Sequence, residues 1–249
     1  MSVTNYESFV PLSHHAPSSL VKKIIFIFRQ VLDLQLFTIY RDAKSCLPEF
    51  HGRILDVGCG NSPFQHLLPK NSIYTGLDID KSDHFSYKNS NIVTYNGDLI
   101  PFADETFDGI ICTEVLEHIF EQQSFVKEIH RVMKPNGSAF ITIPWSAREH
   151  YLPFDYFRVT SSGLMRMFSC FSSVDITARG GDVASIISKI IALWFRCIFF
   201  RSLKNIFVFP LMLAITPFIM MLALLAHVCL FFKIGSPNDP LGYTIKLRR

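Results

Sequence analysis

Short apolar runs typical of β-strands alternate with helical stretches through the first part of the chain. The segment 121–133 is expected to be a helix, and 134–137 after it predicts a turn. Strands separated by helices predict a parallel sheet with crossover helices. The predicted strands occupy residues 53–57, 72–77, 91–95, 107–112 and 138–143.

Three more elements are expected towards the carboxyl end of the chain. Residues 161–168 predict a helix whose N-cap is Ser161 or Ser162. Residues 173–178 predict a sixth strand, and residues 242–247 alternate like a final strand.

A further helix is expected before the first strand. The stretch 20–42 is apolar but carries Lys22, Lys23, Arg29 and Asp33, a pattern that predicts an amphipathic helix.

The most apolar part of the chain lies between the sixth and final strands. From 205 to 232, His227 is the one side chain that protonation can charge at neutral pH, and Pro217 near the middle argues for a break. Residues 183–200 keep basic residues among apolar ones, a pattern suited to a membrane interface.

This apolar insert is expected to enter one leaflet of a membrane and return. The final strand must rejoin the sheet, and basic residues flank the apolar run on both sides, so both ends favour the cytoplasmic side. The alternatives are a buried helical subdomain, which would leave the protein cytoplasmic, and a dimer interface.

Composition excludes several classes of protein. Of 249 residues, 49% are hydrophobic and 18% are charged, and the mean hydropathy is +0.27, which excludes intrinsic disorder. A net charge of +3 is too small to favour nucleic acid. The six cysteines are scattered, so no disulfide framework or zinc ribbon is expected. Residues 1–20 lack the pattern of a signal peptide.

Candidate binding residues follow the first three predicted strands. Gly58 and Gly60 come directly after the first strand, where a ligand can approach the backbone closely. Asp78 and Asp98 follow the second and third strands, and Pro63 takes the place of the third glycine of a dinucleotide loop. Each feature alone also fits a plain turn. Their shared position at one end of successive strands favours a nucleoside site.

The segment 54–145 resembles a class I S-adenosylmethionine-dependent methyltransferase, of the group that includes small-molecule and quinone methyltransferases. The resemblance implies an α/β fold, with a Rossmann-like seven-stranded methyltransferase sheet, helices on both faces, and the apolar helical insert between strands six and seven. The matching blocks are 55–60, 76–79, 97–102, 107–108, 114–118 and 128–137.

The resemblance implies that S-adenosylmethionine lies along this end of the sheet. Asp56 would orient the glycine loop and the amino end of the cofactor. Asp78 would bind the ribose and Asp98 would border the adenine, whereas Thr113 and Glu114 would face the methyl-transfer site. The implied cofactor-binding positions are Asp56, Gly58, Cys59, Gly60, Asp78, Ile79, Asp98, Leu99, Thr113 and Glu114.

The acceptor pocket is expected in the segment after the fifth strand, which is similar to a segment of methyltransferases encoded among polysaccharide and lipid-glycan genes. His150, Tyr156 and Arg158 are its candidate residues, and His118 is a further candidate that equally fits packing at a helix start. The alternative is a small aromatic lid core in which Arg158 pairs with Asp155. No metal site is expected, because His, Asp and Glu do not gather at ligand spacing along the sequence.

The sequence thus predicts methyl transfer from S-adenosylmethionine to a small-molecule or lipid-linked acceptor, on oxygen, nitrogen or carbon. One alternative is a catalytically silent, methyltransferase-like scaffold at a membrane. Another is a nicotinamide-dependent reductase, against which Pro63 and the block 114–118 count. The expected partners are the acceptor and a membrane surface but no nucleic acid, and a homodimer is left open.

Four parts of the chain are expected. They are an N-terminal segment with the amphipathic helix (1–42), the methyltransferase domain (43–180), the apolar insert (181–236) and the returning final strand (237–249).

Overall fold

A computed structural model describes residues 19–79, 92–198 and 203–249. The chain divides into two compact units. A sheet unit contains residues 41–177 and 243–249, and a helical unit contains residues 17–40 and 178–242. The helical unit therefore combines two stretches of chain that the sequence analysis treated as separate parts.

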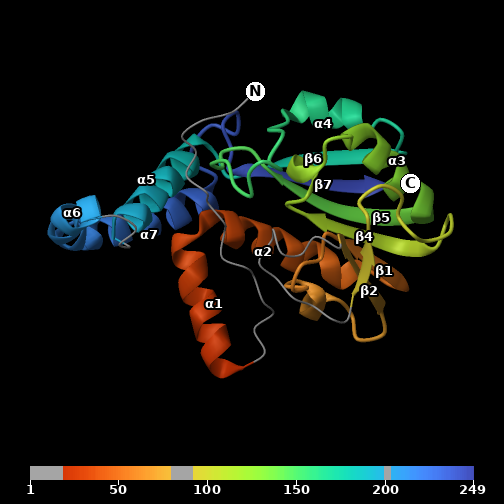
Figure 1. Cartoon of the computed structure of the whole chain (residues 1–249), viewed down its shortest axis with the longest axis horizontal. Coiled ribbons are helices and arrows are strands. Elements are labelled where there is room, and N and C mark those ends of the chain that lie inside the picture. The colour runs from red at the N-terminus through yellow and green to blue at the C-terminus, as the bar shows by residue number, and fades with distance from the viewer. Residues whose placement is uncertain (1–18, 80–91, 199–202) are drawn as a thin grey trace. The chain divides into compact units, whose positions relative to one another are not determined.

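The sheet has seven strands in the order β3-β2-β1-β4-β5-β7-β6, which confirms the predicted fold class (Figure 1). β1 pairs in parallel with both β2 and β4, and β4 pairs in parallel with β5. β7 lies between β5 and β6, as its return to the sheet requires. The strands are β1 (Arg53–Val57), β2 (Ile73–Ile79), β3 (Val93–Tyr95), β4 (Phe107–Thr113), β5 (Met133–Pro144), β6 (Ser173–Arg179) and β7 (Gly242–Arg248).

The central strands are apolar because they are buried on both faces. Four of the five residues of β1 are buried, and the same holds for most of β4. The register sets Asp56 beside Gly76 and Val57 beside Leu77, so β1 ends two residues before the end of β2. The loop after β1 and the residue Asp78 therefore share one edge of the sheet.

Two local predictions of the sheet unit need correction. The predicted turn 134–137 lies inside β5, where the register with β4 shifts and Asn136 adopts a φ of +64°. The bulge absorbs the turn residues without ending the strand. The N-cap of α4 (Ser161–Met167) is Thr160, whose hydroxyl accepts from the backbone of Gly163, and not one of the two serines after it.

The other bounds of the sheet unit agree with the expected elements within a few residues. α3 (Gln122–Val132) connects β4 to β5 and packs against β5. A short 3-10 helix, η4 (Leu116–His118), precedes it. β3 begins at Val93, whereas residue 91 of the predicted third strand lies outside the described residues.

The predicted amphipathic helix 20–42 is two helices, α1 (Leu20–Leu32) and α2 (Leu34–Cys46). Asp33 separates them, because its backbone leaves the helical conformation and its carboxylate accepts from the backbone N–H of Leu36. This is the behaviour of an N-cap residue, which starts a new helix in place of continuing the old one. None of the residues of α1 is buried.

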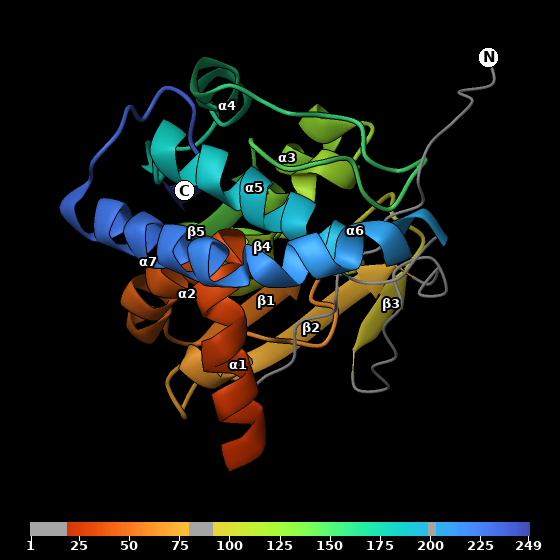
Figure 2. The same cartoon turned by 90° about the vertical axis from the view of Figure 1, so that its left-hand side faces the viewer.

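The predicted insert forms α5 (Asp182–Ile198), α6 (Leu203–Ala214) and α7 (Thr216–Phe232). The break predicted near Pro217 is confirmed, since α7 begins at the residue before this proline. α5 and α7 run side by side (Figure 2).

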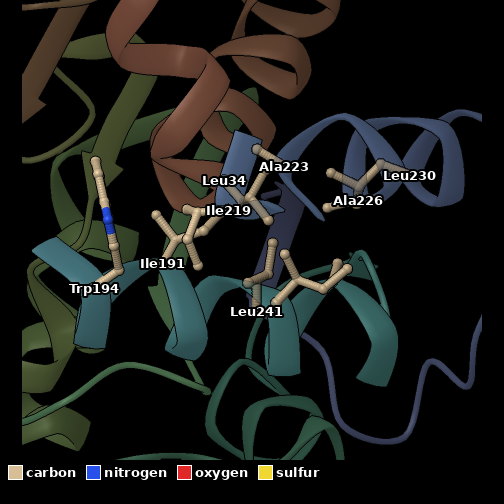
Figure 3. Close-up of a cluster of buried hydrophobic side chains, with 10 residues drawn as sticks. Leu34, Ile191, Trp194, Ile219, Ala223, Ala226, Leu230 and Leu241 are labelled. Atoms are coloured by element: carbon tan, nitrogen blue, oxygen red, sulfur yellow. The ribbon is translucent and has the colours of Figure 1, made fainter. Parts of the chain in front are cut away.

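A buried core holds the helical unit together (Figure 3). Leu34 of α2 joins residues of α5 and α7, so the amino-terminal helices fold with the insert. The Trp194 indole N–H donates to the carbonyl of Met212 at 3.1 Å. The core consists of Leu34, Ala184, Ile187, Ile191, Trp194, Ile219, Ala223, Ala226, Leu230 and Leu241.

The side chain of His227 in α7 packs against α1 and α2 within the helical unit. Its Nε2 lies 3.1 Å from the carbonyl of Val31, and its ring packs edge-on against Phe37 with 4.5 Å between ring centroids.

Among the described helices, none alone has both the length and the apolar character of a membrane span. Residues 208–214 and 216–232 together meet both criteria, but their axes bend by 51° at the break.

Candidate functional site

The loop after β1 is held against the end of β2 by its backbone. The N–H groups of Gly58 and Cys59 both donate to the carbonyl of Leu77, at 2.8 and 3.2 Å. Gly58 adopts a φ of +69°, and a Cβ at this position would lie 2.3 Å from Cγ2 of Val115. Backbone conformation and space therefore both require glycine.

Asp78 joins this loop to β2 through its carboxylate. Oδ2 accepts from the N–H of Gly60 at 2.7 Å, and Oδ1 accepts from the N–H of Ile79 at 2.8 Å. The residue is 4% exposed. A carboxylate accepts hydrogen bonds only, and this is the chemistry that ribose hydroxyls require of a binding residue.

Asp56 lies beneath the loop as a buried carboxyl. The Tyr74 hydroxyl donates to its Oδ2 at 2.8 Å. Burial, with a smaller contribution from Asp78, raises the pKa of Asp56 to about 7 despite this hydrogen bond. Tyr74 was missed by the sequence analysis as a site residue. Its place in the predicted second strand, beside the strand that carries Asp56, was the available signal.

Cys59 packs in the interior beneath the loop and does not serve as a nucleophile. It is buried, and burial with the nearby carboxylates of Asp56 and Asp78 raises the pKa of its thiol far above the usual range. The thiol therefore stays neutral and poorly reactive.

The expected adenine border is more open than the rest of the site. Asp98 is exposed and lies in a bend after β3, where the side chain of Asn96 accepts from the backbone N–H of Asp98 and donates to its carboxylate. Leu99 is 70% exposed, and Ile79 is half-buried at the end of β2. Exposed apolar side chains at this edge are suited to contact with a flat base.

Thr113 and Glu114 lie at the end of β4, as expected. Thr113 pairs with Thr142 of β5, and the N–H of Glu114 donates to the carbonyl of Thr142 at 3.0 Å. Glu114 has a φ of +54°, which is unusual for a residue other than glycine and typical of functional sites.

A second group of polar side chains gathers between η4 and the loop after β5. The rings of His118 and His150 lie 4.9 Å apart, and both have their Nε2 atoms within 4 Å of Oε1 of Glu117, at 3.7 and 3.9 Å. Glu117 is fully buried. Burial and the charge of Glu114 raise its pKa well above the usual range.

This second group revises one premise of the sequence analysis. His118 and His150 are 32 positions apart in the chain, yet with Glu117 they bring three ligand-type atoms within 4.8 Å of one another. Spacing along the sequence could not reveal this cluster, because η4 and the loop after β5, which are far apart in the chain, build it together. Glu117 was treated only as part of a sequence block.

The acceptor candidates after β5 differ in accessibility. Arg158 forms a two-pronged ion pair with Asp155, at 2.6 and 2.7 Å, so the alternative of an Arg158–Asp155 pair is realised. Burial alone would raise the pKa of Asp155, but the hydrogen bonds from Arg158 and His150 hold it below the usual range. Tyr156 is 40% exposed and its ring contacts Phe120.

Residues 55–141 match a family described as a methyltransferase domain. The chain is 30% identical over 110 residues to an uncharacterised protein of Methanocaldococcus jannaschii, covering 42% of this chain and 48% of that protein. It is 31% identical over 98 residues to a ubiquinone biosynthesis O-methyltransferase of Coxiella burnetii, covering 36% and 42%.

A third relative is a cycloartenol-C-24-methyltransferase of Oryza sativa, 32% identical over 113 residues, which covers 41% of this chain and 33% of that protein. The matched segments thus span less than half the length of these relatives.

A solved structure supports the fold. The S-adenosylmethionine-dependent methyltransferase from Archaeoglobus fulgidus superimposes with a TM-score of 0.53 at 18% identity, over 90% of this chain and 99% of that one. At this identity the likeness shows the fold alone. Together with the glycine loop tied to Asp78, the comparisons identify residues 55–141 as a methyltransferase domain on a sheet with the fold of an S-adenosylmethionine-dependent methyltransferase.

Proposed function

We propose that this chain transfers a methyl group from S-adenosylmethionine to a small-molecule or lipid-linked acceptor. The observation that carries the proposal is the loop of Gly58 to Gly60, which is fixed by Leu77 and Asp78 at the carboxyl edge of the sheet. The sulfonium already activates the methyl group, so the protein has to position the acceptor and exclude water.

The acceptor atom is open to all three chemistries. Two of the similar proteins are named for transfer to oxygen and to C-24 of cycloartenol. A hydroxyl acceptor also needs a base. Burial and the neighbouring imidazole of His150 lower the pKa of His118 to about 4, which makes the imidazole of His118 a weak base for this step.

The lipid-linked form of the acceptor is favoured by the outer surface of the helical unit. α7 is apolar on its buried face and also on its exposed face, a pattern that water does not favour. Phe231 and Phe232 are 80% and 67% exposed, and Phe28 of α1 is 69% exposed. Exposed apolar patches of this kind typically contact membranes or other proteins.

The exposed apolar residues of α1 and α7 support attachment to the cytoplasmic face of a membrane, either peripherally or by the bent pair α6–α7 entering one leaflet. Lys22 and Lys23 lie on α1 beside its apolar residues, and Lys233 follows α7 directly. Basic residues next to an apolar face add attraction to anionic lipid head groups.

Calorimetry with S-adenosylmethionine tests the cofactor site. The variant Asp78→Ala should weaken binding by about 10- to 150-fold, because each lost hydrogen bond to a charged group contributes about 1.5–3 kcal/mol. Asp175→Ala is the matched control, since it removes an exposed carboxylate from β6. Equal affinity in wild type and folded Asp78→Ala would overturn the assignment.

Flotation with anionic phospholipid vesicles tests the surface of the helical unit. Wild type should float with the vesicles, and the double variant Phe28→Ser/Phe231→Ser should remain in solution. Phe120→Ser is the control, because Phe120 is 67% exposed but belongs to the sheet unit. Wild type that fails to bind vesicles would refute membrane attachment and leave the cofactor assignment intact.

A further inference from the structure

Glu117 is a buried carboxylate that lacks the usual compensation. Its side chain is fully buried, and neither carboxylate oxygen has a hydrogen-bond partner among the described residues. Burying an ionised carboxylate without a partner is costly, so an arrangement of this kind calls for a bound cation or a proton.

The two imidazoles beside Glu117 each have their other nitrogen occupied. Nδ1 of His118 lies 2.8 Å from the carbonyl of Phe154, which only an N–H can approach favourably. Nδ1 of His150 lies 3.1 Å from the carbonyl of Arg148 and 3.2 Å from Oδ2 of Asp155. Nδ1 is therefore the protonated atom of both neutral rings, and both Nε2 lone pairs are directed to the side of Glu117.

Three lone-pair donors thus converge on one small space. The Nε2–Oε1 distances of 3.7 and 3.9 Å are too long for hydrogen bonds. They are close to the separation of two ligands that share one ion, which is about 3.4 Å for bonds of about 2.1 Å at the tetrahedral angle. A cation between these atoms would convert mutual repulsion into coordination.

The hydrogen bonds at Nδ1 of His118 and His150 are also those expected of histidines that bind a metal. A histidine that binds a metal typically donates its other N–H to a carboxylate or a carbonyl, which fixes the ring. The carbonyl of Arg148 and the carboxylate of Asp155 share this role for His150, and the carbonyl of Phe154 has it for His118. Arg158 holds Asp155 in place through its two-pronged ion pair.

We propose that Glu117, His118 and His150 bind one divalent cation of the first transition series. Two imidazole nitrogens and one carboxylate favour such ions over Mg²⁺ or Ca²⁺, which prefer oxygen ligands throughout. Three protein ligands leave at least one position for water or an oxygen of the acceptor. This last role rests on the proposed function, whereas binding of the ion does not.

Titration with Co²⁺, followed by its visible absorption, tests the site directly. The protein should bind one equivalent of Co²⁺ after treatment with a chelator. Glu117→Gln and His150→Gln should each lose more than about 100-fold in affinity for Co²⁺. Substituting a residue that only hydrogen-bonds to a metal ligand already costs about 10- to 100-fold, and loss of a ligand should cost more. Asp155→Asn should lose about 10- to 100-fold. His51→Gln is the matched control, since His51 is exposed before β1 at the other end of the strands.

Thermal unfolding separates a metal site from a protonated carboxyl. Excess Zn²⁺ should raise the melting temperature of wild type by at least about 5 °C and leave that of Glu117→Gln unchanged. A buried neutral Glu117 would instead give a wild type that does not respond to Zn²⁺. That result, or Co²⁺ affinity in Glu117→Gln equal to wild type, would overturn the proposal. Calorimetry with S-adenosylmethionine would still report separately on the cofactor site.

Discussion

Val115 fills the space that a side chain at Gly58 would need. A Cβ built on Gly58 would lie 2.3 Å from Cγ2 of Val115, and the φ of Gly58 is +69°. The segment after β4 therefore shapes the loop after β1. Two stretches of chain that would contact the cofactor and the methyl-transfer site constrain each other before any ligand binds.

Gly58→Ala should lower the free energy of unfolding by about 2–3 kcal/mol, through steric overlap and a left-handed backbone. The double variant Gly58→Ala/Val115→Ala should recover part of this loss, because it removes the overlap but not the backbone strain. Urea unfolding of the two single variants and the double variant measures the coupling. Strictly additive effects would contradict the contact.

Asp56 should make the stability of the cofactor-free protein depend on pH. Its pKa is raised from 3.8 to about 7, so the folded chain holds this proton more tightly than the unfolded chain does. Its contribution is complete below about pH 4 and is lost as the pH rises through about 7, with a slope of at most about 1.4 kcal/mol per pH unit.

Urea unfolding between pH 4 and 8 checks this dependence as the difference between wild type and Asp56→Asn. The difference removes the opposite contribution of His118, whose pKa is lowered to about 4. That contribution grows as the pH rises from about 4 towards the ordinary value near 6.5. A difference that stays constant with pH would show that Asp56 is ionised throughout.

Arg158→Ala should destabilise the protein by about 3 kcal/mol, because it leaves the buried carboxylate of Asp155 without its two-pronged partner. The side chain of Asp155 is 1% exposed and that of Arg158 is 22% exposed. Because Arg158 is partly exposed, we expect the low end of the range of about 3–5 kcal/mol that removing one partner of a buried ion pair typically costs. Tyr156→Phe should change stability by less than about 0.5 kcal/mol, since the ring is partly exposed. Chemical denaturation compares the two, and equal effects would contradict this division of roles.

Leu34→Ala should cost about 3 kcal/mol of stability, because it opens a cavity in the core between α2, α5 and α7. Phe28→Ala should cost little, since Phe28 is exposed. The two variants should show the reverse order in vesicle binding. Urea unfolding together with flotation detects this crossover, and parallel losses in both assays would argue against it.

The strands were predictable because short apolar runs report burial on both faces of a parallel sheet. The glycine loop and Asp78 were predictable because the carboxyl ends of parallel strands meet at one edge. The break at Asp33 was not, since the surrounding residues keep helical spacing and the break depends on one side chain that caps the second helix. The bulge in β5 was not predictable either, because turns and bulges favour the same residue types, such as asparagine and glycine.

The cluster of Glu117, His118 and His150 was beyond sequence reasoning for a different reason. Its members come from η4 and from the loop after β5, and the sheet has to fold before these two segments meet. The packing of α1 and α2 against the helices of the insert was also beyond sequence reasoning. Amphipathic spacing shows that α1 has an apolar face but does not show what, if anything, covers it.

The position of Leu34 in the core of the helical unit has a consequence for synthesis of the protein. Its partners begin at Ala184, 150 positions later in the chain. At about 5–20 residues per second, the ribosome needs roughly 8–30 s to deliver them. During that interval α1 and the start of α2 emerge with apolar side chains that nothing in the nascent chain yet covers. These helices are therefore the segment on which a chaperone or a lipid surface can act first, before the sheet is complete.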